Sequence, residues 1–239
     1  MLENIILENI LFLDVEAVPQ SPSYDDLPEE FRELWDKKST GIRKPEQTAA
    51  EIYERAGIYA EFGRIICISA GYLTRQGDGR RAFRIKSFCN EDEKLLLEEF
   101  GDVLQQFYKT KRNAYLCAHN GKEFDFPYIA RRMLVNGVKL PQALNIHGQK
   151  PWETSFLDTM ELWKFGDYKN FTSLNLLATV FGIPSPKDDI DGSMVAMVYY
   201  QEKNLPRIVE YCEKDVLTVA KLFLKLRADD SEISEVVHA

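Results

Sequence analysis

Four acidic residues and one tyrosine have the types and spacing needed for phosphodiester chemistry. Asp14 and Glu16 form an Asp-x-Glu step at the end of an apolar run, and Asp125 closes a polar string. Tyr211 and Asp215 form a Tyr-x-x-x-Asp step. Carboxylate oxygens are the ligands that Mg²⁺ and Mn²⁺ prefer. If the fold gathers these acids, they form a site for two divalent metal ions, which can activate water and stabilise a leaving oxygen.

The local geometry favours such a gathering. Side chains two apart on a strand share a face, so Asp14 and Glu16 point the same way. Residues four apart on a helix are neighbours, which places Tyr211 about one turn from Asp215. Two ionised carboxylates 6 Å apart repel by about 3 kcal/mol at an effective dielectric of 20. A cluster of four acids therefore requires cations, or protons held at raised pKa values.

In order and type, these three motifs resemble those of the DEDD superfamily of 3′–5′ exonucleases. The tyrosine four residues before the last aspartate is similar to the DEDDy branch, which includes the proofreading domain of family B DNA polymerases. The chain most resembles stand-alone bacterial proteins predicted to be exonucleases related to that domain. The matching segments run from about residue 10 to about residue 225. The resemblance therefore covers nearly the whole chain.

The resemblance implies a role for each residue. Asp14 would bridge both metal ions, and Glu16 would bind one and help to position the attacking water. Asp125 would hold the second metal, often through water, and Asp215 would ligate the metal on the nucleophile's side. The Tyr211 hydroxyl would orient the water. The resemblance further implies substrate contacts from Ala17, Asn120 and Phe124, where Asn120 matches the asparagine of the second motif.

Ordinary structural roles compete with these assignments. Asp14, Glu16 and Asp215 could be solvent-facing acids, and Tyr211 could simply pack in the core. Asp125 could cap a helix, because aspartate accepts hydrogen bonds from free backbone amides. A cap or a sheet-edge contact is the prediction for Asp158, and neither His119 nor His147 is expected to bind metal. Core packing is the default for the three phenylalanines that could instead stack on a terminal base, Phe12, Phe124 and Phe126.

Composition narrows the class of protein. The chain has 239 residues, 45% of them hydrophobic, which suffices for one larger α/β domain. No apolar run approaches the roughly 18 residues that cross a bilayer, and the first residues lack a basic segment, so we expect a cytoplasmic protein with no membrane partner. The net charge of −8 argues against a general binder of polyanions. The four cysteines show no metal-type spacing and are expected to be reduced core residues: Cys67, Cys89, Cys117 and Cys212.

The pattern of elements predicts an α/β fold with a mixed five- or six-stranded sheet, in which a three-strand meander precedes parallel strands flanked by helices. This agrees with the ribonuclease H-like fold that the resemblance implies. Residues 1–228 are expected to form a single domain with a helical insertion at about residues 19–62, and 229–239 an acidic frayed tail. The expected strands are 5–15, 64–73, 81–88 and 114–118. The expected helices are 48–58, 90–108 (capped by Asn90), 126–136, 173–181, 193–203 and 206–226.

Taken together, these features predict a metal-dependent 3′–5′ exonuclease that uses two Mg²⁺ or Mn²⁺ ions and releases nucleoside monophosphates from the 3′ ends of single-stranded DNA. RNA is an open alternative as substrate. A second alternative is a non-catalytic module of the same fold that binds nucleic acid or a partner. The absence of a polymerase segment within these residues suggests a polymerase or repair partner in trans, and the oligomeric state is left open.

Overall fold

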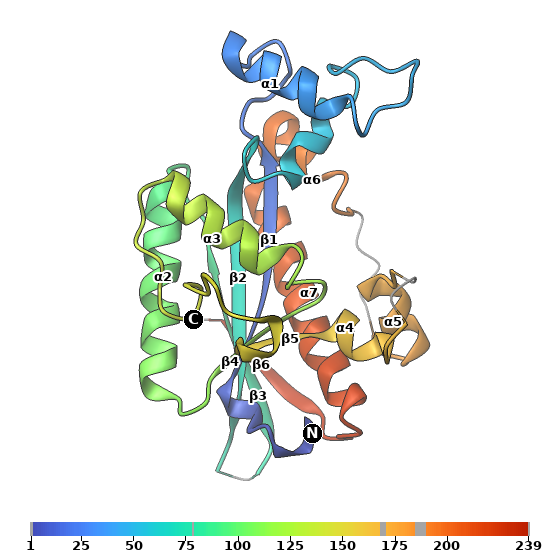
Figure 1. Cartoon of the computed structure of the whole chain (residues 1–239). Helices are drawn as coiled ribbons and strands as arrows, with labels where there is room; N and C mark the ends of the chain where they lie inside the picture. The colour runs from blue at the N-terminus through green and yellow to red at the C-terminus, as the bar shows by residue number, and fades with distance from the viewer. Residues whose placement is uncertain (1, 78, 168–170, 185–189, 239) are drawn as a thin grey trace.

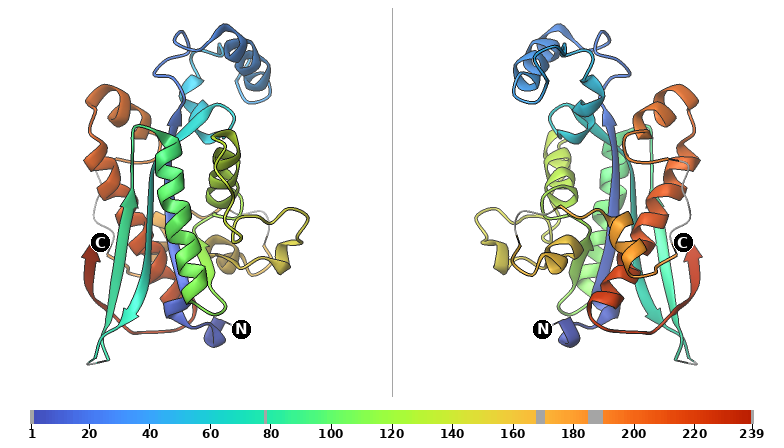
Figure 2. Two further views of the ribbon diagram at one scale, coloured as in Figure 1. Left: turned by 90° about the vertical axis from the view of Figure 1, so that its left-hand side faces the viewer. Right: turned by 90° about the vertical axis from the view of Figure 1, so that its right-hand side faces the viewer.

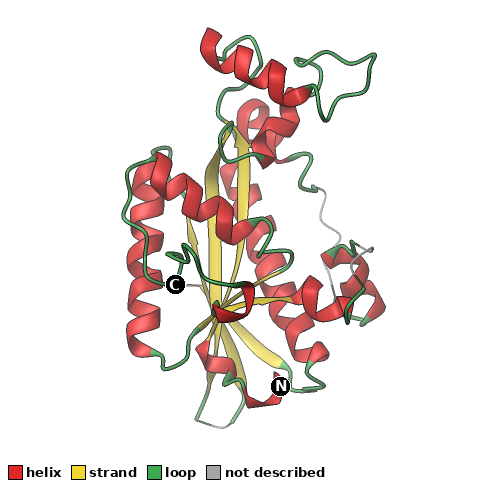
Figure 3. Ribbon diagram, in the orientation of Figure 1, coloured by secondary structure: helices red, strands yellow, loops and turns green. Residues whose placement is uncertain are grey.

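A mixed six-stranded sheet forms the centre of the computed structural model, which describes residues 2–77, 79–167, 171–184 and 190–238 (Figure 3). The strand order is β5-β4-β1-β2-β3-β6. The strands are β1 (Ile10–Pro19), β2 (Gly63–Arg75), β3 (Arg81–Phe88), β4 (Tyr115–Ala118), β5 (Phe156–Asp158) and β6 (Ile233–His238). The pairs β1–β2 and β2–β3 are antiparallel, and β4 and β5 continue in parallel on the other side of β1. The predicted meander followed by parallel strands is confirmed.

The two faces of the sheet carry different helices, because side chains alternate along β1. Leu11, Leu13 and Val15 belong to a core cluster with residues of α2 (Glu93–Thr110) and α3 (Asp125–Val135). Ile10 and Phe12 belong to a cluster on the opposite face, with α7 (Leu205–Leu226). Figure 2 shows α3 and α7 on opposite sides of the sheet. The long central strand is therefore buried on both faces.

The remaining helical elements are short. They are 3₁₀ turns at Leu2–Asn4, Leu7–Asn9 and Pro151–Glu153, α4 (Thr159–Lys164), α5 (Leu174–Val180), α6 (Val195–Met197) and a π-helical turn at Val198–Glu202. The helix predicted at 193–203 is thus split into an α and a π segment. The predicted cap of α2 is wrong: Asp92, rather than Asn90, accepts a hydrogen bond from Lys94 N at 2.9 Å. The Asn90 Oδ1 instead accepts a hydrogen bond from the backbone N–H of Asp92.

The segment between β1 and β2 is an insertion with its own small core. It holds α1 (Glu29–Ser39) and a 3₁₀ helix, η3 (Tyr53–Ile58), and it lies at the end of β1 at the top of Figure 1. Trp35 is fully buried there and donates its indole N–H to Ala49 O at 2.9 Å. The helix predicted over 48–58 is wrong in part, since only the second half is helical and it takes the tighter 3₁₀ form.

The prediction of a frayed tail at 229–239 is wrong. Residues 233–238 form β6, which pairs in parallel with β3 at the sheet edge. Arg81 fixes the start of this segment through an ion pair with Asp229 at 3.0 Å. Ile233 packs against the core cluster on the α7 face. Acidic residues suggested a solvated tail, but the β-branched residues between them suit an edge strand.

Two predictions from composition have separate outcomes. None of the helices in the described ranges is both long enough and apolar enough to span a bilayer. Cys67, Cys117 and Cys212 are buried, as expected, and all four thiols are free. Cys89 is exposed, so its assignment to the core was wrong. It follows the last residue of β3, where the chain leaves the sheet for the surface.

Candidate metal and nuclease site

The site begins where β1 extends beyond the end of the neighbouring strand β4. The pairing of β4 with β1 ends at Phe12, so Asp14 and Glu16 lie beyond the end of β4. Across β1 and β2, Asp14 pairs with Ser69 and Glu16 with Cys67. These two residues supply a hydroxyl and a thiol beside the acids rather than a cationic group. The strand thus carries two carboxylates into a gap that β4 leaves open.

A regular strand would turn the next residue away from this gap. A register shift between Glu16 and Ala17 breaks the pairing with β2 at that point. Such a bulge re-aims the side chains of a strand. Consistent with this, Glu16 and Ala17 line the same cavity.

The loop after β4 is held in a constrained conformation. Asn120 has a φ of 62°, in the left-handed region that non-glycine residues rarely adopt. A Cβ on Gly121 would lie 2.4 Å from the Ala118 Cβ, so glycine is required there. The Asp158 carboxylate accepts hydrogen bonds from Asn120 N at 2.9 Å and Lys122 N at 3.1 Å. Strained backbone of this kind persists where surrounding contacts over-determine it.

Asp158 has the structural role that was predicted for it. Besides the loop amides, its carboxylate accepts hydrogen bonds from Met160 N and Glu161 N at the start of α4. All four donors are backbone N–H groups, which compensate the buried charge. Asp158 therefore caps α4 and anchors the loop that carries Asn120, and it stays outside the acid cluster.

Asp125 is the first residue of α3, and Phe124 occupies the cap position without a side-chain cap. Capping alone therefore does not account for Asp125. Burial raises the pKa of its carboxyl group, and the backbone N–H of Val15, which lies between Asp14 and Glu16 on β1, is near enough to oppose part of that rise. The side chain is only 3% exposed. The first turn of α3 thus lies close to the acid-bearing part of β1.

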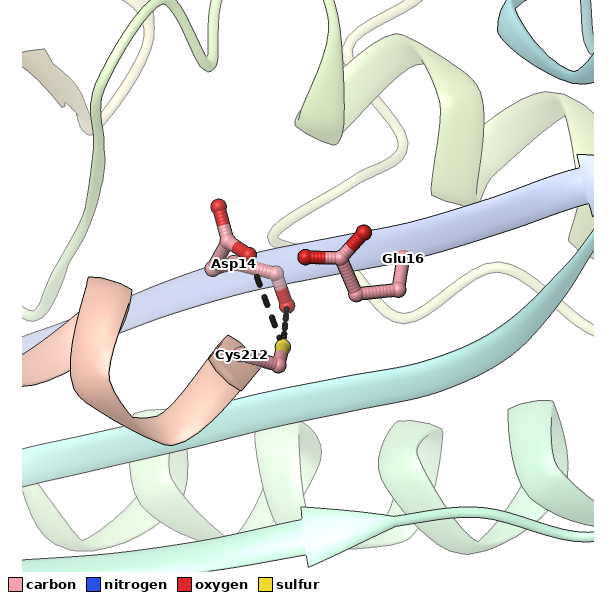
Figure 4. Close-up of side chains that lie close together, drawn as sticks. All are labelled: Asp14, Glu16 and Cys212. Carbon is pink, nitrogen blue, oxygen red and sulfur yellow. Dashed lines mark hydrogen bonds between the residues drawn. The ribbon is translucent and has the colours of Figure 1, made fainter. Parts of the chain in front are cut away.

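Helix α7 supplies the remaining groups from the other face of the sheet. Tyr211 and Asp215 lie one turn apart on it and share a hydrogen bond between their side chains. Cys212 is fully buried, and its Sγ donates to the Asp14 carboxylate and carbonyl, each at 3.5 Å. Figure 4 shows this thiol next to Asp14, with Glu16 further along the same strand. One oxygen of each carboxylate lies within 4.8 Å of the Cys212 sulfur and of the other.

All residues predicted for the site converge on one cavity of about 400 Å³. This volume falls within the range of small-molecule sites. The predicted residues that line it are Asp14, Glu16, Ala17, Asn120, Phe124, Asp125, Tyr211 and Asp215. Residues from β1, α3 and α7, far apart in sequence, thus face the same space.

Three acids of the cluster, Asp14, Glu16 and Asp125, have raised pKa values. Burial raises the pKa of Asp14 to about 6, and weaker hydrogen bonds from Cys212 and Glu16 oppose that rise. Burial raises the pKa of Glu16 well above its usual range, and the charges of Asp14 and Asp215 raise it further. The pKa of Asp125 is also raised, first by burial and then by Asp14. Burial therefore opposes the ionisation of all three acids, and a charge on Asp14 opposes it further at Glu16 and Asp125.

This donor set fits divalent cations. No lysine or arginine forms an ion pair with Asp14, Glu16 or Asp125 within the described ranges. Their oxygens are hard ligands of the kind that Mg²⁺ and Mn²⁺ take. In addition, the Asn120 Oδ1 is buried and has no hydrogen-bond partner among the described residues. A polar atom left in this state at a cavity wall is typical of a site that binds a ligand.

Other candidates are kept out of the cluster. His119 lines the cavity, but its ring nitrogens bond the Thr159 hydroxyl at 2.9 Å and the Thr172 carbonyl at 2.8 Å. His147 lines a different cavity, beside α3. Phe12 and Phe126 are core residues at 0% and 1% exposure, so only Phe124 of the three phenylalanines can meet a substrate.

Sequence reasoning missed several residues that line the cavity or lie beside it. Cys212 carried a signal, because it lies three residues before Asp215 and so on a neighbouring part of the α7 surface. Gly57 and Ile58, from the insertion, carried none, because their position depends on how the insertion folds. Phe171, Leu174 and Gly192 also line the cavity and come from segments that the motifs do not reach.

Comparisons with known proteins identify a family and a shared fold. The model of a family described as "Predicted 3'-5' exonuclease related to the exonuclease domain of PolB" matches residues 58–238. This span holds Asp125, Tyr211 and Asp215, whereas Asp14 and Glu16 precede it. No curated protein is detectably similar to the chain.

A similar solved structure is the family B DNA polymerase from the hyperthermophilic archaeon Pyrobaculum calidifontis, with a TM-score of 0.54 and 17% identity. The match covers 91% of this chain and 24% of the polymerase chain. The likeness shows a shared fold, so the predicted ribonuclease H-like architecture is confirmed.

Proposed function

We propose that this chain, which belongs to the family of predicted 3′–5′ exonucleases related to the exonuclease domain of PolB, hydrolyses the terminal phosphodiester at the 3′ end of single-stranded DNA. The products would be nucleoside monophosphates. The observation that carries the proposal is the convergence of Asp14, Glu16, Asp125 and Asp215 on one cavity. Of these, Asp14, Glu16 and Asp125 have pKa values raised mainly by burial. A buried acid cluster of this kind is suited to hydrolysis assisted by divalent metal ions.

Two divalent cations, Mg²⁺ or Mn²⁺, would be held by these four carboxylates and, when bound, would supply Lewis-acid chemistry to the scissile phosphodiester. The chain's own contribution is to fix the ligands. Asp14 and Glu16 are set by the β1 backbone, and Asp125 is set by its place in the first turn of α3, close to Val15 of β1. Asp215 is held on α7, which packs against β1.

Tyr211 is placed to orient a water molecule. Its hydroxyl bonds Asp215, and burial followed by the charges of Asp215 and Glu16 raises the pKa of the phenol above its usual value. The phenol therefore stays neutral at physiological pH and acts as a hydrogen-bond partner rather than as a base. This matches the role implied by the DEDDy resemblance.

Substrate contacts would come from groups around the acids. The Asn120 Oδ1 can accept a hydrogen bond from the terminal nucleotide, since it is unpartnered among the described residues. Ala17 presents a small surface close to the acids, and Phe124 an aromatic one. The net charge of −8 favours a short contact with the chain end over binding along a polymer. Action with a polymerase or repair partner in trans remains part of the proposal.

One assay tests this function. A 5′-labelled single-stranded oligodeoxynucleotide is incubated with the protein and Mn²⁺ or Mg²⁺, next to Asp14→Asn and a control at an exposed acid, Asp102→Asn. We expect a ladder that shortens from the 3′ end with wild type and Asp102→Asn only. Absence of cleavage with either metal would reject the function.

The same assay separates the substrates. RNA and duplex DNA of the same sequence are run in parallel with the single strand. Faster cleavage of RNA would keep the chemistry and replace the proposed substrate. Binding without cleavage by wild type would instead favour the non-catalytic module.

A further inference from the structure

The insertion between β1 and β2 supplies part of the wall of the site cavity. Gly57 and Ile58, at the end of η3, line it together with the acids. Ile58 is 51% exposed, although most large apolar residues of the insertion are packed in its own core. An apolar side chain that is exposed at the wall of a cavity is available to a ligand.

Contacts on three sides hold η3 in place. The Tyr128 hydroxyl, from α3, donates to Gly57 O at 2.6 Å. A Cβ on Gly57 would lie 3.1 Å from atoms of Val18 and Pro19, so η3 sits close against the end of β1. A Cβ on Gly63 would lie 2.2 Å from the Tyr128 hydroxyl, which shows how little space is left beside that bond. Ile58 is therefore presented from a rigid support rather than from a loose loop.

The same tyrosine links Ile58 to an aromatic wall residue. The rings of Phe124 and Tyr128 are 5.2 Å apart, and Phe124 also lines the cavity. The cavity thus combines carboxylates with apolar groups, Ile58 and Phe124, which α3 and η3 position through Tyr128. A nucleotide has the matching division, because its phosphate would meet the cation-binding acids and its base has flat apolar faces.

We propose that Ile58 is a substrate-contacting residue of the insertion, which packs against the nucleobase at the 3′ end, next to Phe124. This inference rests on the proposed nuclease function and adds a specificity role for the insertion. Tyr128 is a positioning residue, because it holds the Gly57 carbonyl and so fixes the next residue, Ile58. The base would be gripped without regard to its identity, since an aliphatic side chain offers no hydrogen bonds.

The test compares two oligonucleotides that differ only in the last nucleotide, which carries a base or is abasic. For each protein, kcat/KM on the substrate with the base is divided by kcat/KM on the abasic substrate, and this ratio measures how much the base contributes. We expect Ile58→Ala to lower this ratio by roughly 3- to 10-fold, mainly through KM, because apolar contact with the base is lost. Ile58→Met should keep most of the ratio. The matched control is Leu95→Ala on α2, which removes a side chain of the same 51% exposure outside the cavity.

Two further measurements keep the inference open to refutation. Tyr128→Phe should lower the same ratio, because it removes the hydrogen bond to Gly57 O that fixes Ile58. If Ile58→Ala melts early, Ile58→Val removes one methyl group and should lower the ratio by about 2-fold. A ratio in Ile58→Ala equal to that of wild type and Leu95→Ala would overturn the base contact even though the enzyme is active. If wild type cleaves neither oligonucleotide, the proposed function fails first.

Discussion

Two glutamates in this molecule are equally buried but have different surroundings. Glu16 and Glu93 are each 7% exposed. Glu93 lies at the start of α2 and is paired with an arginine, whereas Glu16 lies on β1 among other carboxylates. Removing a carboxylate from water is costly unless opposite charge or hydrogen bonds compensate it. The comparison shows which acid is part of the scaffold and which awaits a ligand.

The surroundings of Glu93 are complete. Arg132 binds both of its oxygens, from Nε at 2.9 Å and from a terminal nitrogen at 2.5 Å. Ile65 N donates to the first oxygen at 2.7 Å and Asn136 Nδ2 to the second at 3.0 Å. Arg132 also donates to Ala60 O at 2.8 Å, which ties the insertion to α3. This network joins α2, α3, β2 and the insertion.

The surroundings of Glu16 lack such compensation. Burial raises its pKa most, and among the described residues the carboxylates of Asp14, Asp215 and Asp125 and the Cys67 thiol raise it further. The fold thus tolerates at one place an arrangement that it avoids at another. We infer that the missing positive charge comes from solution, as divalent cations.

The largest expected effect is on hydrolysis. Asp14→Asn keeps the shape of the side chain and removes its charge. It should lower kcat/KM by about 10³- to 10⁴-fold, because a carboxylate proposed to bind the metal ions is lost. Single-turnover cleavage of a labelled oligonucleotide measures this. Asp102→Asn should retain wild-type rates. A loss below 10-fold in Asp14→Asn would show that the cluster is not the reaction site.

The next effect concerns the compensated region. Arg132→Met leaves Glu93 buried without its cation and should lower the free energy of unfolding by about 3–5 kcal/mol. The midpoint of thermal unfolding would fall by about 10 °C. Arg131→Met changes the exposed neighbour and should leave the midpoint within about 1 °C. Equal effects of the two substitutions would remove Glu93 from its assigned structural role.

A smaller effect is expected at the tyrosine. Tyr211→Phe removes only the hydroxyl and should lower kcat by roughly 100-fold, while the affinity for Mn²⁺ stays within about 2-fold. The two measurements are cleavage under saturating substrate and a metal titration. A fall in metal affinity of the same size as the fall in kcat would assign Tyr211 to the metal site instead of to orientation of water.

The smallest expected effect is a gain in the free energy of unfolding, opposite in sign to the loss expected for Arg132→Met. The pKa of Asp14 is raised from 3.8 to about 6, so between these pH values the folded protein holds a proton that the unfolded chain releases. Without metal, the contribution of Asp14 to the free energy of unfolding therefore falls as pH rises through that window. Asp14→Asn in EDTA should then raise the free energy of unfolding by about 2 kcal/mol above pH 6, and by nothing below about pH 4. Denaturation at several pH values checks this, and a destabilised variant at pH 7.5 would contradict it.

The fold and the site were predictable from the sequence to different degrees. The meander and the long helices follow from strong local patterns, such as the apolar stripe of α2. The acids at positions 14, 16, 125 and 215 could be predicted as candidate site residues because each belongs to a distinctive motif. The burial of Asp14, Glu16 and Asp125 and the pKa shifts that follow from it could not, because they depend on where β4 ends relative to β1.

The errors have a common physical origin. Pairing of β6 with β3 joins segments about 150 residues apart, and the acidic composition of the C-terminal residues hides the strand. Likewise, the position of Ile58 and Gly57 at the cavity depends on a bond between Gly57 and Tyr128, which are 71 residues apart. Contacts of this kind leave no periodic trace in a single sequence. The insertion was recognised as an insertion, but its role at the site depends on tertiary structure.

The most direct test of the assignment of these acids to a metal site is the binding of Mn²⁺, measured by titration calorimetry at pH 7.5 without nucleic acid. Wild type is expected to take up Mn²⁺ saturably, and Asp14→Asn to bind it at least about 10-fold more weakly, because one carboxylate of the cluster has lost its charge. Arg131→Met serves as the control and should bind like wild type. Binding that is absent in wild type, or unchanged in Asp14→Asn, would contradict the assignment of these acids to a metal site.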